Sequence, residues 1–548
     1  MKLRILALVF FALVQAPFVG AAAETTNRPN ILLIVVDDMG YSDMGPFGSE
    51  IKTPSIDSLA DQGAKFTDFY VGPSCSVTRS MLFSGNDNHV AGLGNMNELL
   101  TPNQVGQPGY EGFLNNRVAS LASLLKTAGY HTYMSGKWHL GHEPDQDPSK
   151  RGFERVYTML QGGTSHFDDE WMMYANYTPT YREDGVRTHV PQGFYSTEFY
   201  ADQIVKYMDE QKDDKPFFAY LSFTAPHDPL HVPDEWLDRY KGQYDAGYDE
   251  LRGRRLARMK ELGIIPTETV LGPWLHLVPK WEELTAEQKK MEIRRMEIYA
   301  AMIGNIDHHI GRVLRYLESS GKKKDTLVVF FSDNGANGFK MDSYPGTDEA
   351  WMEHNSDNRL SNWGKRASRI AQGPGWAQAS STPFHLYKNF LAEGGIRSPL
   401  IISGPGVAYQ GETVNGLTHV MDLAPTFLQL AGVTYPATYD GNPVEQPRGK
   451  SMVGLLSKKS STVRGPDEAI GWEYNNFKAI RIGDHKGTWI SKPFGPSEWQ
   501  IFDLSVDPGE SKDLSTQEPE LRESLIDAWN DYAKSVGVIP PEGGLFGD

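Results

Sequence analysis

Two acidic clusters in the sequence each follow an apolar run that is typical of a buried β-strand. Asp37 and Asp38 come directly after NILLIVV, and Asp333 and Asn334 follow TLVVFF with one serine between. Each cluster alone would be ordinary turn or helix-cap chemistry. Two such clusters favour a metal site, because the carboxyl ends of parallel strands meet at one edge of a sheet. Oxygen ligands without thiolate or imidazole favour calcium or magnesium.

The only cysteine of the chain, Cys75, lies where a loop is predicted to enter a short helix. A lone thiol is more often a small buried apolar residue than a reactive group. Here the amino end of a helix would stabilise negative charge, and Arg79, one turn later, would add a cation beside the cysteine side chain. This segment therefore suits an activated group or a bound anion.

Two lysines and two histidines follow or precede other strand-like segments. Lys137 and His139 follow Tyr130–Met134, His227 follows PFFAYLSF, and Lys388 precedes a Gly-Gly turn. Taken singly, such residues are more often solvated charges or structural histidines. The sequence contains no HExxH zinc helix, no GxSxG nucleophile elbow and no GxxxxGK[ST] phosphate loop that would compete with this set.

The elements that must position these residues predict an α/β fold. Two further strands are expected at Pro216–Phe223 and Pro399–Ile402, and the strand-like runs alternate with helical patterns, as in parallel β-α-β winding. Helices are expected at Pro54–Gly63, at Val118–Ala128, and after the capping box Thr285–Gln288. Because the runs lack polar alternation, we expect a large, mixed, mainly parallel sheet that helices cover on both faces.

The composition changes after about residue 435, where Pro, Gly and Asn become frequent. We therefore predict a catalytic α/β domain over residues 24–434 and a smaller C-terminal α+β domain over residues 435–548. The second domain should contain strands near Phe477–Ile482 and Trp499–Leu504 and a closing helix near Glu518–Lys534.

Residues 1–23 match a cleavable secretory signal: Lys2 and Arg4 precede the apolar run Ile5–Val14, and small residues end the segment at Ala21–Ala23. The apolar run is far shorter than the roughly 20 residues of a membrane-spanning helix. We therefore expect a periplasmic or secreted protein with no membrane association after cleavage. The formal net charge of −17 argues against nucleic acid or a long sulfated polyanion as the main partner.

With these residues assembled, the chain resembles the type I sulfatases of the alkaline phosphatase superfamily, and within them the bacterial arylsulfatases. The resemblance runs from Arg28 to about Leu514. Its motifs are RPNI from Arg28, DDMG from Asp37, CSVTR from Cys75, GKWHLG from Gly136, APH from Ala225, SDNG from Ser332, LYK from Leu386 and GGIR from Gly394.

The resemblance implies an alkaline phosphatase-like fold and a sulfuric ester hydrolase that releases sulfate from small sulfate monoesters. A maturation enzyme would oxidise Cys75 to formylglycine, whose hydrate supplies the attacking hydroxyl. Calcium, with magnesium less expected, would be bound by Asp37, Asp38, Cys75, Asp333 and Asn334. The remaining roles would be as follows: Arg79 stabilises the hydrate, Lys137 and Lys388 hold the sulfate oxygens, His227 protonates the leaving alcohol and His139 deprotonates the hydrate.

One residue departs from the family signature, which usually has Pro or Ala where this chain has Val77. The departure puts the efficiency of Cys75 maturation in question. Two alternatives stay open. A phosphonate or phosphodiester hydrolase of the same superfamily shares the metal and nucleophile plan, and a non-catalytic binder of sulfated ligands is supported by Val77 only. Aryl, steroid and sugar sulfates all remain candidate substrates, and the segments Gly162–Val190 and Ser343–Trp376 are predicted to wall the pocket.

Overall fold

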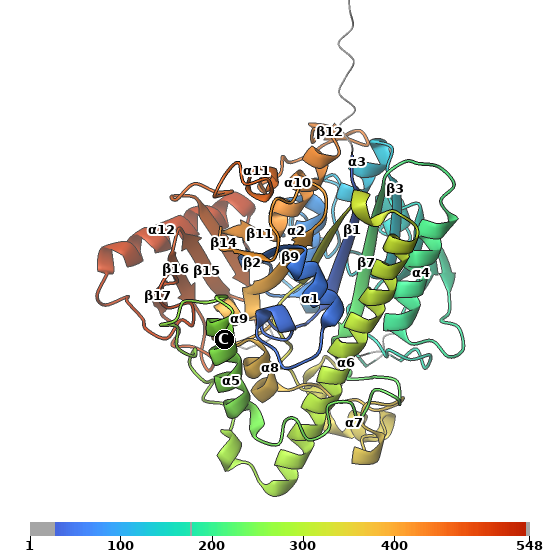
Figure 1. Cartoon of the computed structure of the whole chain (residues 1–548). Helices are drawn as coiled ribbons and strands as arrows, with labels where there is room; N and C mark the ends of the chain where they lie inside the picture. Colours follow the sequence, from blue (N-terminus) through green and yellow to red (C-terminus); the bar gives the residue numbers. More distant parts are fainter. Residues whose placement is uncertain (1–27, 172, 176–177, 544–548) are drawn as a thin grey trace, which may run out of the picture.

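The computed structural model describes residues 28–171, 173–175 and 178–543 (Figure 1). The signal predicted at residues 1–23 lies outside the described residues. Within them, every helix is too short or too polar to cross a bilayer.

The centre of the molecule is a block of five parallel strands within an eleven-stranded sheet. Their spatial order is β8 (Thr326–Ser332), β1 (Asn30–Asp37), β7 (Phe217–Pro226), β3 (His131–Lys137) and β4 (Arg155–Met159). Nearly every residue of these strands is buried. The parallel block brings the carboxyl ends of β1, β3, β7 and β8 to one edge.

Antiparallel strands extend this block on both sides and make the sheet mixed, as predicted. β9 (Arg397–Ser403) runs antiparallel to both β8 and β2 (Gly63–Tyr70), so the strand predicted at Pro399–Ile402 is present but is not part of the parallel winding. The sheet ends in short strands: β10 (Glu412–Val414) and β11 (Thr418–His419) beside β2, and β5 (Tyr181–Glu183) and β6 (Val186–Thr188) beside β4.

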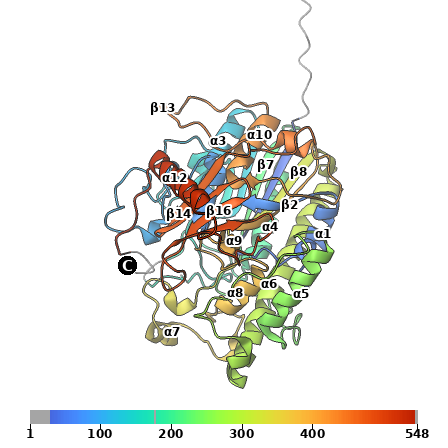
Figure 2. The same cartoon turned by 90° about the vertical axis from the view of Figure 1, so that its left-hand side faces the viewer.

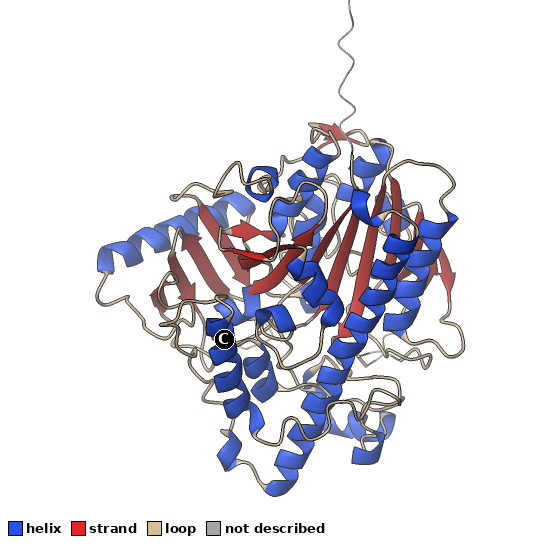
Figure 3. Ribbon diagram, viewed as in Figure 1, coloured by secondary structure: helices blue, strands red, loops and turns tan. Residues whose placement is uncertain are grey.

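Helices cover both faces of the sheet (Figure 3). Alternate residues of β1 enter two separate cores, one with Leu33 and the other with Ile34. The Leu33 core is covered by α2 (Cys75–Ser84), α3 (Leu121–Thr127) and α10 (Leu423–Leu430). The Ile34 core is covered by α1 (Pro54–Asp61), α4 (Ser196–Glu210), α6 (Ala286–Ser319) and the pair α5 (Gly247–Glu261) and α8 (Pro374–Ser380).

The C-terminal part forms a second sheet with one long helix packed on it (Figure 2). Four antiparallel strands follow in order: β14 (Ala469–Tyr474), β15 (Phe477–Ile482), β16 (His485–Trp489) and β17 (Trp499–Asp503), with α12 (Pro519–Val536) across them. The strands and helix expected in this region are therefore confirmed. Trp472 and Tyr474 belong to the Leu33 core, so the two sheets share apolar packing. The boundary at residue 435 stays a prediction.

Two predicted helices are shorter in the structure, and the one expected at Pro54–Gly63 ends at Asp61. The helix expected from Val118 begins only at Leu121, because the backbone of Ser120 is extended, with φ −69° and ψ 133°, and Ser120 is the N-cap residue. The capping box at Thr285 is present and opens α6 as expected.

The short elements complete the fold: α7 (Glu349–Asn355), α9 (Glu393–Ile396), α11 (Val453–Leu456), β12 (Thr438–Tyr439) and β13 (Asn442–Pro443).

Candidate active site

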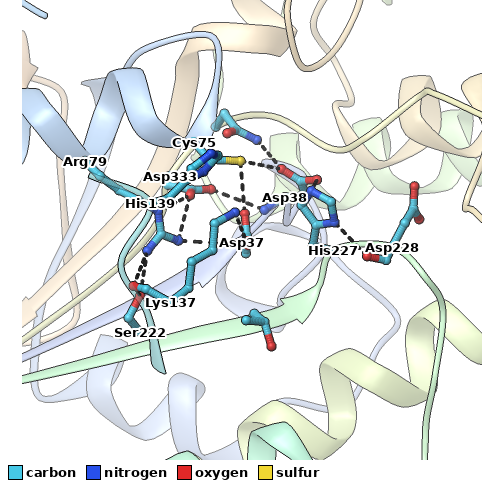
Figure 4. Close-up of polar contacts among 12 residues, drawn as sticks. Asp37, Asp38, Cys75, Arg79, Lys137, His139, Ser222, His227, Asp228 and Asp333 are labelled. Atoms are coloured by element: carbon cyan, nitrogen blue, oxygen red, sulfur yellow. Dashed lines mark hydrogen bonds and ion pairs between the residues drawn. The ribbon is translucent and has the colours of Figure 1, made fainter. Parts of the chain in front are cut away.

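The two acidic clusters meet at the carboxyl ends of β1 and β8, as their position after apolar runs predicted (Figure 4). The backbone N–H of Asp38 donates to Asp333 Oδ1 at 3.3 Å, and the Asn334 amide nitrogen donates to Asp38 Oδ1 at 2.6 Å. Asp37, Asp38, Asp333 and Asn334 are all buried. Residues almost three hundred positions apart thus form one polar cluster inside the protein.

Cys75 is the first residue of α2 and lies against this cluster. Its Sγ is 3.2 Å from Asp37 Oδ1, 3.8 Å from Asp38 Oδ1 and 3.4 Å from Lys388 Nζ. Burial, together with the negative charge of Asp37, raises the pKa of the Cys75 thiol well above its usual range. The encoded side chain is therefore a protonated thiol at the centre of the site.

Arg79 is fully buried one turn along α2 and is fixed on several sides (Figure 4). Its Nε and Nη2 lie 2.9 and 2.8 Å from Asp333 Oδ2. Nη1 donates to Ser222 Oγ at 2.6 Å, to the Tyr220 hydroxyl at 3.1 Å and to the Lys137 carbonyl at 3.0 Å. Asp333 is therefore the carboxylate partner of Arg79, and the other contacts hold the guanidinium in one position.

Two lysines bring positive charge to the remaining carboxylates. Lys137 ends β3 and its Nζ donates to Asp37 Oδ2 at 2.6 Å. Lys388 Nζ donates to Asp38 Oδ2 at 2.8 Å. Both lysines are buried, so each is a desolvated cation whose partner is a carboxylate of the cluster.

The two predicted histidines are both buried but have different surroundings. His227 Nε2 is 3.3 Å from Asp38 Oδ2, while its Nδ1 is 2.8 Å from the carbonyl oxygen of Asp228. His139 lies instead beside Glu98, with Nε2 3.3 Å from Oε1. Burial lowers the pKa of each imidazole to about 4, which leaves both rings neutral near pH 7.

The oxygen atoms of the cluster fit a hard divalent cation. Asn334 Oδ1 is buried and has no hydrogen-bond partner among the described residues, although buried acceptors are normally paired. Burial and the neighbouring Asp37 raise the pKa of Asp333 to about 7, as expected for a carboxyl group that is withdrawn from water beside another carboxylate. Asp37, Asp38, Cys75 and His227 also offer ligand atoms within 4.8 Å of one another. The arrangement thus suits a cation, without selecting calcium over magnesium.

An apolar pocket opens on Cys75. Its wall contains Met96, Leu99, Tyr174, Phe339, Ser343, Tyr344 and Pro345, and its polar lining comes from Cys75, His139, His227, Lys388 and Asn389. The predicted walls at 162–190 and 343–376 contribute Gly162, Tyr174 and the residues Ser343 to Pro345. The remaining wall residues belong to segments that showed no recognisable pattern in the sequence.

Sequence reasoning missed several polar residues that hold the site together. Ser222 is a hydroxyl side chain in the middle of a largely apolar strand, and that interruption could have indicated a contact. Asp228 follows His227 directly, and its carboxylate accepts from the Asn337 amide at 2.9 Å. Glu98 carries no signal, since it lies in a loop-like segment far from every motif.

Comparisons with known proteins show similarity to sulfatases. The family model described as Sulfatase matches residues 29–433, and the one described as N-sulphoglucosamine sulphohydrolase, C-terminal, matches residues 384–531. An uncharacterized sulfatase of Schizosaccharomyces pombe is 42% identical over 526 residues, which cover 94% of this chain and 95% of the relative. The arylsulfatase of Klebsiella aerogenes is 42% identical over 443 residues, which cover 80% and 94%.

Solved structures share the fold at lower identity. Ps i-CgsB in complex with k-i-k-neocarrahexaose has a TM-score of 0.64 and 24% identity, with 92% of this chain and 93% of that chain covered. BT4656 in complex with its substrate D-glucosamine-2-N,6-O-disulfate has a TM-score of 0.59 and 21% identity, with 93% and 98% covered.

Proposed function

Because this chain belongs to the sulfatase family and is a sulfuric ester hydrolase, we propose that it acts on sulfate monoesters of aromatic alcohols. One observation carries the proposal: Cys75, two lysines and two histidines line or adjoin a pocket whose other lining residues are mostly aromatic or apolar. The 42% identity to the Klebsiella arylsulfatase supports the same conclusion.

Two groups would complete the site. A maturation enzyme would convert Cys75 to formylglycine, whose hydrated aldehyde supplies the hydroxyl nucleophile that a protonated thiol does not. Calcium would be held by the oxygens of Asp37, Asp38, Asp333 and Asn334, and it would supply positive charge that polarises a bound sulfate oxygen. The unpartnered Asn334 Oδ1 supports this assignment.

The chain's own cations would bind the sulfate group. Sulfuryl transfer resembles phosphoryl transfer, in which fixed positive charges stabilise the oxygens of the transferred group. Lys388 lines the pocket, and its Nζ is 3.4 Å from Cys75 Sγ. Lys137 does not line the pocket, but its Nζ donates to Asp37, which contacts Cys75. Arg79 would add a fixed positive charge that stabilises the hydrate, because Ser222 and Asp333 hold its guanidinium in place.

The two neutral imidazoles would move protons. His227 donates its Nδ1 hydrogen to the Asp228 carbonyl, so Nε2 of the neutral ring carries no proton. Nε2 would first take up the proton released by the attacking hydroxyl and would then pass it to the leaving oxygen of the alcohol. His139 lines the same pocket and would remove the proton from the second hydroxyl of the hydrate, so that the carbonyl re-forms and sulfate is expelled. Two proton carriers suit a reaction in which one oxygen gains a proton and another loses one.

The pocket wall favours an aromatic or apolar alcohol over a polyanionic sugar. Tyr174 and Tyr344 meet edge to face with centroids 5.8 Å apart, and Phe339 lies beside Tyr344. Lys388 is the only Lys or Arg among the described lining residues. A sugar with several sulfate groups, such as the disulfate bound by BT4656, would need more cations than this pocket offers.

Val77 fits the folded structure despite its departure from the signature. Its side chain is buried in the Leu33 core, where the backbone of Gly72 passes close to Cγ1. The residue lies in the first turn of α2, where the backbone N–H has no intrahelical acceptor and proline would also be tolerated. Any effect of valine would therefore fall on recognition by the maturation enzyme.

We also propose that the protein is exported, since residues 1–23 have the pattern of a cleavable signal. Fractionation of the native host followed by N-terminal sequencing checks this. A mature chain that begins near Glu24 in the periplasm or medium supports export. A cytoplasmic chain that retains Met1 contradicts it.

Initial rates on four esters test the proposed function. A sulfate, a phosphodiester and a phosphonate of the same phenol would be compared with a glucosamine disulfate, on calcium-loaded and matured protein. We expect the aryl sulfate to give the highest kcat/KM. A higher value for the phosphodiester or phosphonate would reject the sulfatase assignment, and a higher value for the sugar would reject the aryl preference.

A further inference from the structure

Glu98 is a buried carboxylate that belongs to none of the sequence motifs. It lies in the 3-10 turn Asn97–Leu99, between the pocket residues Met96 and Leu99, and its side chain is only 6% exposed. Its carboxylate oxygens are 3.3 and 3.5 Å from His139 Nε2. A second imidazole, His142, approaches Oε1 at 3.8 Å. Glu98 therefore contacts Nε2 of a histidine that lines the pocket.

This contact fixes which nitrogen of His139 carries the hydrogen. An ionised carboxylate accepts hydrogen bonds and has none to donate, so Nε2 must carry the proton of the neutral ring. The lone pair is then on Nδ1, which is buried and has no hydrogen-bond partner among the described residues. One nitrogen is thus occupied by the protein, and the other is left to exchange a proton.

The charge state of Glu98 agrees with this arrangement. Burial alone would raise the pKa of the carboxyl, but the charge and hydrogen bond of His139 lower it to about 2. Glu98 is then an anion throughout the range in which the enzyme folds and works. Once His139 has taken a proton, the same anion would stabilise the imidazolium.

The backbone of Gly162 packs closely against the imidazole ring of His139. A Cβ on Gly162 would lie 2.7 Å from His139 Cε1 and 3.0 Å from Nε2, so any larger residue would displace the imidazole. The next residue, Gly163, faces His227 in the same way, with a Cβ position 3.3 Å from Cε1. His139 is therefore located between a carboxylate and a residue that must be small.

We propose that Glu98 is the positioning residue of His139: it holds the imidazole as the Nε2–H tautomer and makes Nδ1 the nitrogen that takes up and returns the proton during turnover. Gly162 provides the space that this orientation requires. The inference rests on the proposed function for its catalytic part. Its structural part, the tautomer, can be measured independently of activity.

Two matched measurements test the proposal on full-length protein. The imidazole tautomer would be read by ¹⁵N NMR of histidine-labelled protein, with His139→Gln used to assign the signal. Steady-state kcat and KM on an aryl sulfate would be measured for Glu98→Gln, Glu98→Ala and Gly162→Ala, with His142→Gln as the control that contacts the same carboxylate from outside the pocket.

We expect the Nε2–H tautomer in the parent protein and a shift toward Nδ1–H in Glu98→Ala. The kcat of Glu98→Ala should fall by about 10- to 100-fold, as for other residues that orient a functional imidazole, while KM changes little. Glu98→Gln keeps a carbonyl acceptor for Nε2–H and should retain the tautomer and more of kcat. Gly162→Ala should lower kcat, and His142→Gln should match the parent.

An Nδ1–H signal in the parent, or a Glu98→Ala protein with unchanged tautomer and kcat, would overturn the proposal. Thermal unfolding of each variant separates loss of the fold from loss of orientation, because a purely structural role would lower the melting temperature and leave kcat of the folded protein intact. If the parent hydrolyses no sulfate ester, the proposed function fails, but the NMR arm still decides whether Glu98 sets the tautomer.

Discussion

The catalytic cluster and a second buried network beneath the C-terminal sheet have the same charge composition. Each contains three carboxylates and three cationic side chains. The catalytic cluster consists of Asp37, Asp38, Asp333, Arg79, Lys137 and Lys388, and the second, here called the interface network, consists of Asp68, Glu393, Glu510, Arg397, Arg481 and Lys486.

The interface network pairs its charges with one another. Both oxygens of Asp68 accept from Arg481, at 2.8 and 2.9 Å. Lys486 Nζ lies 2.7 Å from Glu393 and 2.9 Å from Glu510. These contacts join β2 of the large sheet to β15 and the short helix α9 to β16, so the network connects two parts of the fold.

The catalytic cluster differs in the polar atoms that stay unpaired in and beside it and in the thiol that it surrounds. A cavity does not by itself separate the two, because Asp68, Arg397 and Arg481 of the interface network also line one. Asn334 Oδ1 and, nearby, His139 Nδ1 lack partners among the described residues, and Cys75 lies between the carboxylates and an open pocket. Buried ion pairs alone are thus weak indicators of function. Unpartnered polar atoms beside a reactive side chain are better ones, because such atoms cost stability unless a ligand satisfies them.

Removal of the central side chain gives the largest expected difference between the two clusters. Cys75→Ala should lower kcat/KM on an aryl sulfate by about 10⁴-fold or more, since the nucleophile is lost. The free energy of unfolding should change by only about 1 kcal/mol, because the substitution is small. Kinetics and denaturant unfolding check both statements. A kcat/KM that falls by only about 100-fold or less would place the nucleophile elsewhere.

Removal of calcium should affect the catalytic cluster alone. Chelation with EGTA should lower activity by about 100-fold or more, because a bound cation contributes several kcal/mol to charge stabilisation. It should also reduce stability, by about 2.7 kcal/mol relative to a calcium concentration of 100 times Kd. Added calcium should restore both, and magnesium serves as the control. Full activity after chelation would contradict the predicted metal site.

A smaller effect is expected when the aromatic wall is truncated. Phe339→Ala should reduce kcat/KM for an aryl sulfate by about 10- to 100-fold through lost apolar contact. The loss should be smaller for methyl sulfate, which is too short to reach the wall. Equal losses on both esters would show that Phe339 supports the site instead of contacting the alcohol.

The interface network should show the reverse behaviour, with the smallest effect on activity. Lys486→Met leaves two buried carboxylates without their shared cation and should cost about 3 to 5 kcal/mol of folding stability. The kcat of the folded protein should stay within about threefold of the parent, since none of its contacts reaches the pocket. The exposed Lys459→Met is the matched control. Loss of kcat in folded Lys486→Met would show that the two clusters are coupled.

The sequence predicted the parts of the site that depend on strand ends and short spacing. The apolar runs before Asp37 and Asp333 identified two buried parallel strands, and parallel strands bring their carboxyl ends together. Cys75 and Arg79 were placed by one turn of helix. The observed contacts bring the two acidic clusters together, and they join the guanidinium of Arg79 to Asp333.

The remaining parts depend on contacts between distant segments that have no periodic pattern. Glu98 reaches His139 from an irregular loop, and Ser222 reaches Arg79 from the middle of an apolar strand. The antiparallel direction of β9 was also hidden, because a fully buried strand has the same apolar pattern in either direction. Such features follow from the tertiary fold.

The central claim is that Cys75 becomes the nucleophile through conversion to formylglycine. The most direct measurement is mass spectrometry of the tryptic peptide that carries Cys75, from protein purified from its native host, with protein made without a maturation enzyme as the control. We predict the mass of formylglycine in the native sample and of cysteine in the control. An unmodified cysteine in native protein would contradict the account and favour a non-catalytic binder of sulfated ligands.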